Sequence, residues 1–154
     1  MALRLGGMGV PRNCDKMGSQ DQILKGLQAW AGQFYGADAT VERLVRLSGG
    51  ASQETWSLDV EQGGKVVDLI LRRVPGGVSV ARNSEAIGLG TEAKLLSCAE
   101  GEVPAPKVVQ VFEPDSDIGE AFLMNRIPGQ TIARKILRDD IYSAARGRLT
   151  EQCG

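Results

Sequence analysis

A short glycine-containing loop between two strand-like runs constrains this chain more than any other feature. The loop lies within the run from Leu47 to Trp56, and apolar, strand-like runs flank it over 41–47 and 55–60. Glycine permits positive φ angles and close approach, so such a loop can present backbone N–H groups to a phosphate. The pattern predicts an antiparallel strand pair whose connecting loop is able to bind an anion.

The residues after this pair extend it into a larger sheet. Gln62-Gly63-Gly64 predicts a tight turn, and further strands are expected over 66–72, 107–112 and 121–127. One helix is expected between the third and fourth strands, with Ser84 as its cap, its end at Ala99 and an apolar face of Leu89, Ala93 and Leu96. The fold class is therefore α+β, with a five-stranded antiparallel sheet, one inserted helix and flanking helices.

The flanking helices are predicted from apolar residues at helical spacing. The first is capped by Ser19 or Asp21, ends near Gly36 and carries the apolar stripe Ile23, Leu27, Trp30 and Phe34. The last is a single helix capped by Thr131, with these residues roughly on one side: Ile132, Ile136, Ile141, Ala145 and Leu149. Trp30 and Trp56 are expected in the core, and Cys98 is expected to be buried by packing.

Composition restricts the classes of function. The 154 residues suit one ordinary domain, and a net charge of −1 offers no bulk attraction to nucleic acid or an anionic membrane. Apolar runs fall short of the roughly 20 residues that span a bilayer. Three distant cysteines favour reduced thiols and a cytoplasmic location, and the lack of histidine excludes Ser-His-Asp chemistry within the chain. The sequence also lacks a metal-ligand cluster, so no metal site is predicted.

Five segments, in this order, resemble the aminoglycoside phosphotransferase and choline kinase-like family, in particular its acyl-CoA-dehydrogenase-associated branch. They are Leu47 to Ser52, Leu69 to Arg73, Thr91 to Leu96, Val103 to Val108 and Phe122 to Gly129. The resemblance covers about 41–154 and implies the amino-terminal, nucleotide-binding lobe of a kinase-like fold. It implies a lobe over 19–130, preceded by a disordered tail or upstream extension over 1–18 and followed by the start of a second lobe over 131–154.

The resemblance also implies a site for ATP or GTP. Arg72 on the third strand would neutralise the nucleotide phosphates, in place of the usual lysine, and Glu92 on the inserted helix would hold it. The alternative for this pair is an ordinary surface ion pair. The loop would cover the phosphates through residues Ser48, Gly49, Gly50, Ala51 and Ser52; its alternative is a plain hairpin turn.

The base would lie against the strand that joins the two lobes. By the same resemblance Ile70 lines the adenine slot, and Met124 stands at its back or merely packs in the core. The carbonyl of Asn125 would accept a hydrogen bond from the adenine amino group, and the N–H of Ile127 would donate one to the ring.

The catalytic parts are expected elsewhere. Phosphoryl transfer needs an aspartate to take the substrate proton and acidic ligands for magnesium. The resemblance places both in a second lobe, so no catalytic residue and no magnesium ligand is assigned to this chain, and Asp139 and Asp140 are not promoted to that role. The chain is expected to be truncated and inactive alone, while the full-length protein would phosphorylate a small-molecule hydroxyl.

Two alternatives remain open from the sequence. The chain could be a non-catalytic, kinase-derived module that binds nucleotide or a protein partner, or a gene fragment without a stable fold. The last helix would carry apolar residues that lack a partner within the chain: Ile132, Ile136, Leu137, Ile141 and Leu149. We therefore expect an exposed apolar patch there and self-association through it.

Overall fold

The computed structural model describes residues 14–48, 53–77 and 87–152 and confirms the α+β class. Two short 3-10 turns, η1 (Pro75–Gly77) and η2 (Asp140–Tyr142), accompany the helices and strands. The helices and strands are, in chain order, α1 (Cys14–Phe34), β1 (Thr40–Arg46), β2 (Glu54–Gln62), β3 (Lys65–Arg73), α2 (Leu89–Ala99), β4 (Val108–Phe112), β5 (Ala121–Asn125), α3 (Ala133–Arg138) and α4 (Ser143–Gln152).

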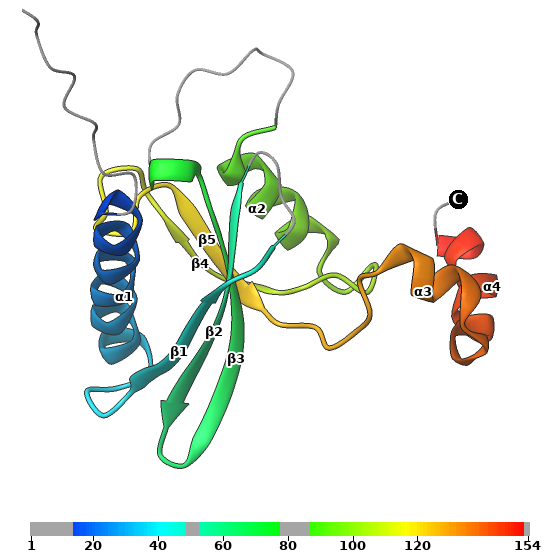
Figure 1. Cartoon of the computed structure of the whole chain (residues 1–154), viewed down its shortest axis with the longest axis horizontal. Helices are drawn as coiled ribbons and strands as arrows, with labels where there is room; N and C mark the ends of the chain where they lie inside the picture. The colour runs from blue at the N-terminus through cyan, green and yellow to red at the C-terminus, as the bar shows by residue number, and fades with distance from the viewer. Residues whose placement is uncertain (1–13, 49–52, 78–86, 153–154) are drawn as a thin grey trace, which may run out of the picture.

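The five strands form one antiparallel sheet in the order β1-β2-β3-β5-β4. Gly63 and Gly64 join β2 to β3, and both have positive φ, of 56° and 79°. Two successive positive φ angles define the type I′ turn, whose twist matches that of the paired strands. Helix α1 covers one face of this sheet and α2 lies on the other (Figure 1). The expected kinase-like lobe architecture is therefore present.

The larger core lies between α1 and the sheet. Ile23, Leu27 and Trp30 of α1 are buried against strand residues such as Leu69 and Leu71. Because side chains alternate along a strand, every second side chain of β3 points into this core. The last of them is the buried Arg73. Both tryptophans are buried, as the sequence predicts.

A smaller core lies on the opposite face, under α2. Leu89 and Ala93 of α2 are buried against Phe122 of β5, and Leu96 and Met124 pack partly buried around them. The predicted apolar face of this helix is therefore confirmed. The packing places the first turn of α2 beside the end of β3, because Phe122 pairs with Arg72 across the two strands.

Several details differ from the sequence prediction. Helix α1 begins at Cys14, before either predicted cap, and α2 begins at Leu89 after Gly88, which provides no side-chain cap. The predicted cap Ser84 lies outside the described residues. Cys98 is exposed, so its predicted burial is wrong. It lies nine residues after Leu89, which at 100° per residue places it on the outer side of the helix.

The predicted last helix is two helices. The chain breaks at Asp139, which has an extended backbone, and α3 and α4 fold back beside each other through η2. The guanidinium of Arg146 in α4 donates to the carbonyls of Ile136 and Asp139, each at 2.9 Å, and so satisfies groups exposed by the break. Figure 1 shows this α3–α4 arm projecting away from the sheet.

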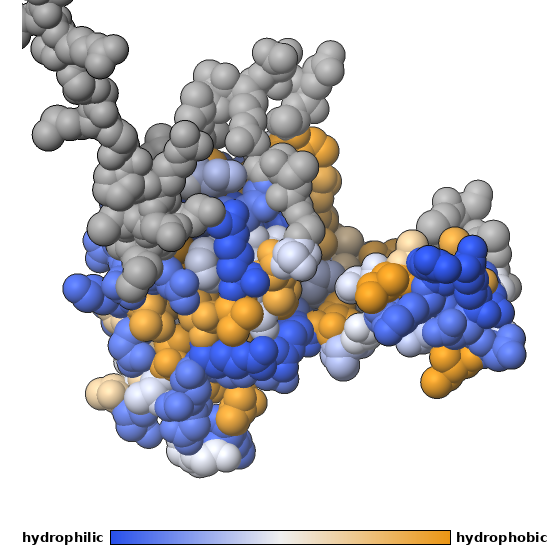
Figure 2. Space-filling view, in the orientation of Figure 1, coloured by the Kyte–Doolittle hydropathy of each residue, from blue (hydrophilic) through white to orange (hydrophobic). Residues whose placement is uncertain are grey.

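The α3–α4 arm leaves apolar side chains exposed, as predicted from the sequence. Ile141 is the extreme case, at 82% exposed. Figure 2 shows hydrophobic patches on the arm, separate from the body of the molecule. The exposed members of the predicted set are Ile132, Leu137, Ile141 and Leu149, whereas Ile136 is half-buried.

Candidate functional site

Two consecutive arginines end β3, and they lie on opposite faces of the sheet. Arg73 is 5% exposed on the α1 face, where its Nε donates to the Ile118 carbonyl at 2.6 Å and its NH1 lies 3.0 Å from Glu54 Oε2. Arg72 points to the α2 face, which the sequence assigned to the nucleotide. Arg73 therefore lies on the opposite face of β3 from Arg72, as alternation along a strand requires.

Arg72 and Glu92 meet, as the sequence predicts. NH1 of Arg72 lies 3.1 Å from Oε1 of Glu92, and the two side chains are 32% and 27% exposed. Glu92 belongs to the first turn of α2, where the helix dipole favours a negative charge. The pair is neither buried nor fully solvated, so the guanidinium is held in place and still reachable from solvent.

A second partner of Arg72 was not predicted. The side-chain oxygen of Gln53 accepts from Nε of Arg72 at 3.1 Å and also from NH2. Gln53 immediately precedes β2, and β2 pairs with β3 so that Thr55 stands opposite Arg72. This register places the start of β2 within reach of the guanidinium; the sequence alone gave no reason to choose Gln53.

Arg72 keeps unused donors between these two partners. A guanidinium has five N–H groups. Gln53 accepts from Nε and from NH2, and Glu92 pairs with NH1, so one N–H on NH1 and one on NH2 are left. A partly exposed cation with spare donors is suited to bind a phosphate.

The predicted base-binding residues lie next to Arg72 on the same face. Ile70 stands two residues before Arg72 on β3 and is paired with Met124 of β5. Both side chains are half-buried, and Met124 packs against the α2 core. Core packing of Met124 is therefore present, and it leaves an apolar strip beside the guanidinium.

At the end of β5, the backbone N–H groups of two successive residues are hydrogen-bonded, whereas that of the third has no acceptor among the described residues. The N–H of Asn125 donates to the Lys107 carbonyl at 3.0 Å, while the Asn125 side-chain oxygen accepts from the Lys107 N–H. The N–H of Arg126 donates to the Asp68 carbonyl at 3.0 Å. Within the described part of the chain, the N–H of Ile127 donates to no acceptor. It is the donor that the sequence assigned to the adenine ring.

Arg126 forms a network that the sequence prediction missed. Its NH1 donates to the Ser57 hydroxyl at 3.0 Å and to Asp59 Oδ1 at 3.2 Å, and its NH2 lies 2.7 Å from Asp68 Oδ1. These acceptors come from β2 and β3, so one side chain ties the segment after β5 to two strands. Alternation along β3 places Asp68 on the same face as Ile70 and Arg72, and pairing with β2 adds Ser57 and Asp59. This pattern of polar residues was the signal in the sequence that could have revealed the network.

The predicted phosphate loop is only partly within the described residues. Ser48 is exposed at the end of β1, next to Leu47, whose N–H donates to the Thr55 carbonyl at 2.8 Å. Gly49, Gly50, Ala51 and Ser52 lie outside the described residues. On either side of this loop, the β1–β2 pairing therefore extends as far as the bond between Leu47 and Thr55.

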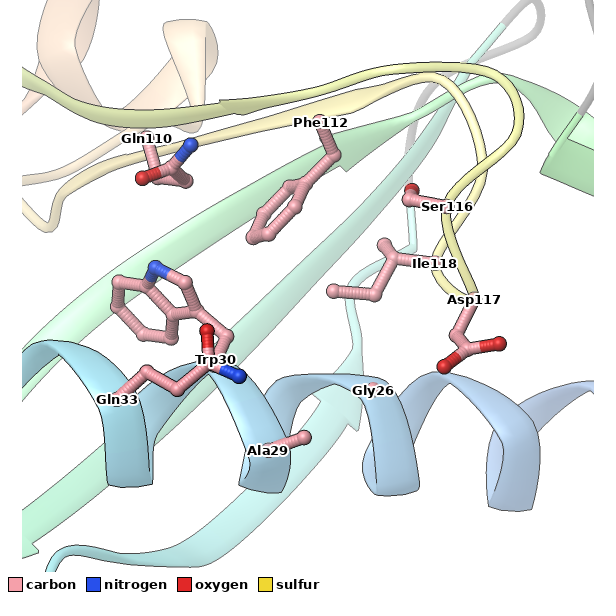
Figure 3. Close-up of a pocket in the computed structure, with 9 residues that line it drawn as sticks. All are labelled: Gly26, Ala29, Trp30, Gln33, Gln110, Phe112, Ser116, Asp117 and Ile118. Atoms are coloured by element: carbon pink, nitrogen blue, oxygen red, sulfur yellow. The ribbon is translucent and has the colours of Figure 1, made fainter.

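A hollow of about 330 Å³ lies away from these residues, on the α1 face. Figure 3 shows Trp30 and Gln33 of α1 facing Gln110 and Phe112 of β4 across it, with Ile118 at one end. The indole N–H of Trp30 is buried without a hydrogen-bond partner. The hollow is on the opposite side of the sheet from Arg72 and is not part of the same site.

Other classes of site find no support among the described residues. Within those residues no cluster of three or more His, Cys, Asp or Glu side chains is placed to hold a metal ion. Among the helices of the described ranges, none combines the length and the apolar composition needed to cross a membrane. The contacts around Arg72 are therefore the strongest candidate site in this part of the chain.

Comparison with known proteins identifies the family. A sequence profile of the phosphotransferase enzyme family matches residues 43–154, which is more than half of the chain. No curated protein and no solved structure matches the chain. The matched range contains all five strands except the start of β1, together with Arg72, Glu92 and the segment after β5. By this match and its kinase-like lobe, the chain belongs to the phosphotransferase enzyme family.

Proposed function

We propose that this chain is the nucleotide-binding lobe of an ATP- or GTP-dependent phosphotransferase that acts on a small-molecule hydroxyl group. Within the family, we assign it to the aminoglycoside phosphotransferase and choline kinase-like group. The observation that carries the proposal is the Arg72–Glu92 ion pair at 3.1 Å. A cation on the third strand, held by a helix carboxylate, is what a kinase-like site uses to neutralise nucleotide phosphates.

The described residues suit a nucleotide chemically. Arg72 has two spare N–H donors for phosphate oxygens, Ile70 and Met124 offer apolar surface to a base, and Ile127 offers a backbone donor to its edge. The nucleotide would supply the phosphoryl group. The protein's part here is to bind and orient it, because no described residue is assigned as proton acceptor or magnesium ligand.

Isothermal titration of the purified chain with ATP and with GTP, each with magnesium, tests the proposal. We expect binding that is lost in Arg72→Gln, because the neutral side chain gives up the charge that faces the phosphates. Arg134→Gln is the matched control: it removes the same charge from an exposed position on α3 and should leave binding unchanged. Equal binding by the two variants would contradict the assignment of Arg72.

A second candidate function is a protein-binding module without catalysis. The exposed apolar residues of the α3–α4 arm favour it, since such a patch marks an interaction surface. Light scattering on the whole chain tests this through self-association. Ile141→Asp should reduce the mean mass at high concentration, whereas Thr131→Asp, at another exposed position that is not apolar, should not. A monomer at every concentration would contradict association through the arm.

A further inference from the structure

The contact between Gln53 and Arg72 has a consequence for ligand binding. Gln53 uses one oxygen to accept from both Nε and NH2 of Arg72, so it covers one whole edge of the guanidinium. Glu92 accepts at the opposite nitrogen, NH1. The arginine is thus held from two sides, by a charged partner on α2 and a neutral partner at the start of β2.

The edge that Gln53 covers has a shape that suits a phosphate. Nε and NH2 are parallel donors, and two oxygens of one phosphate can accept from them together in a fork arrangement. A carboxamide oxygen is a neutral acceptor, so it holds this edge less strongly than an anion does. A phosphate that takes this edge, and not only the spare N–H groups of NH1 and NH2, has to displace Gln53 and loses part of its binding free energy in doing so.

We propose that Gln53 is a positioning residue that sets the phosphate affinity of this lobe by competing for the Nε–NH2 edge of Arg72. The inference rests on the proposed nucleotide site and adds a residue to it. Gln53 keeps the guanidinium oriented when no ligand is bound, and its release is part of the free-energy cost of binding. The ligand class is any di- or triphosphate chain, with or without a nucleoside.

Substitution of Gln53 gives a directional test. Gln53→Ala removes the competitor, so we expect ATP and inorganic tripolyphosphate to bind about tenfold more tightly. Gln53→Glu replaces it with an anion that pairs with Arg72 and repels phosphate, so binding should weaken by at least about tenfold. The expected order of affinity is Ala, wild type, Glu, measured by isothermal titration of the full chain with each ligand.

Two features of the experiment separate the predicted order of affinities from the effects of a damaged protein. Loss of structure can only weaken binding, so a gain in Gln53→Ala cannot come from a damaged protein. Gln110→Ala is the matched control, because Gln110 is half-buried on the α1 face and its side chain bonds only to the adjacent Val111 carbonyl. It should leave both affinities unchanged.

A second measurement tests the contact without any nucleotide. In ¹⁵N-labelled protein, the Nε–H of Arg72 should exchange with water more slowly in wild type than in Gln53→Ala, because a hydrogen-bonded N–H is protected. Tripolyphosphate should shift this resonance in wild type. Equal exchange in the two proteins would overturn the contact, and with it the proposal.

The outcomes separate this inference from the proposed function. If wild type binds ATP, Arg72→Gln does not, and Gln53→Ala binds no more tightly than wild type, the nucleotide site stands and the role of Gln53 is wrong. Weaker binding by Gln53→Ala would likewise show that Gln53 does not compete with phosphate for Arg72. If neither wild type nor Gln53→Ala binds ATP or tripolyphosphate, both proposals fail.

Discussion

The two arginines at the end of β3 show how strongly the role of a residue depends on which face of the sheet it occupies. Arg73 lies on the α1 face at 5% exposure, with Glu54 and the Ile118 carbonyl as partners. Arg72 lies one residue earlier on the other face, about a third exposed, with Glu92 and Gln53 as partners and donors to spare. One residue type at neighbouring positions therefore has a structural role on one face and a proposed binding role on the other.

The difference follows from what covers each face. Helix α1 packs along the sheet and closes a continuous apolar core, so a charge there must be fully paired. Helix α2 covers only the end near Phe122 and leaves the rest of its face to polar side chains such as Asp59 and Asp68. A binding residue needs the second environment, because a ligand cannot reach a cation that is buried under a helix, as Arg73 is at 5% exposed.

The largest effect on stability should come from the buried arginine. Arg73→Met removes the closest cation from the Glu54 carboxylate, which is 11% exposed, and should lower the free energy of unfolding by about 3 kcal/mol. Urea denaturation measures it. Arg46→Met is the control: Arg46 pairs with the same carboxylate at 3.4 Å from an exposed position and should cost at most about 1 kcal/mol. Equal losses would erase the distinction between the faces.

The backbone next to Arg73, where Gly77 and Gly119 are in close contact, is a second place to test stability on this face. Gly119 has φ of +81°, and a Cβ there would stand 2.5 Å from the Cα of Gly77. Gly119→Ala should therefore lower the free energy of unfolding by at least about 2 kcal/mol, again by urea denaturation. Gly129→Ala, where an added Cβ meets nothing within 4 Å, should change it by less than about 0.5 kcal/mol.

On the α2 face we expect a small effect on stability and a large effect on nucleotide binding. Arg72→Met should change the free energy of unfolding by no more than about 1 kcal/mol, because its pair with Glu92 is partly solvated. The same variant should lose nucleotide binding, as argued for Arg72→Gln. A stability loss as large as that of Arg73→Met, seen in the same urea experiment, would show that both arginines are structural.

The smallest expected effect is a pH dependence of stability that comes from Tyr35, on the α1 face. Burial raises the pKa of the Tyr35 phenol above its ordinary value of 10.0. The neutral phenol is favoured in the folded state, so its contribution to stability is complete below pH 10 and falls as the pH rises from there through the raised pKa. Thermal unfolding at pH 8 and above pH 10 should show this loss in wild type and a smaller one in Tyr35→Phe.

Strand pattern predicted most of the fold because its causes are local. Apolar, strand-like runs and turn glycines placed each strand within two residues of its observed bounds, and the inserted helix was found from Leu89, Ala93 and Leu96. The break at Asp139 was missed, since apolar residues continue at helical spacing across it. What stabilises the break is Arg146, which reaches back to two carbonyls, and spacing alone does not reveal that.

For the site, sequence reasoning found the residues whose place follows from alternation or from the resemblance. Arg72 and Glu92 meet as expected. Gln53 and Arg126 were missed because their partners depend on strand register: Gln53 reaches Arg72 through the β2–β3 pairing, and Arg126 reaches Asp59 and Asp68 across two strands. Strand register is fixed only when the sheet assembles, so no short segment of the sequence predicts it.

The strand order has a consequence for how the site forms in time. β2 and β3 are joined by a two-residue turn, and β4 and β5 are neighbours in sequence as well as in the sheet, so each pair can form from local contacts. β3 meets β5 only after the chain has looped through α2, and closing that long loop is the slower event. Arg72 belongs to the first pair and Met124 to the second. We therefore expect hydrogen exchange during refolding to protect both hairpins before their junction, with the candidate site among the last parts of the lobe to assemble.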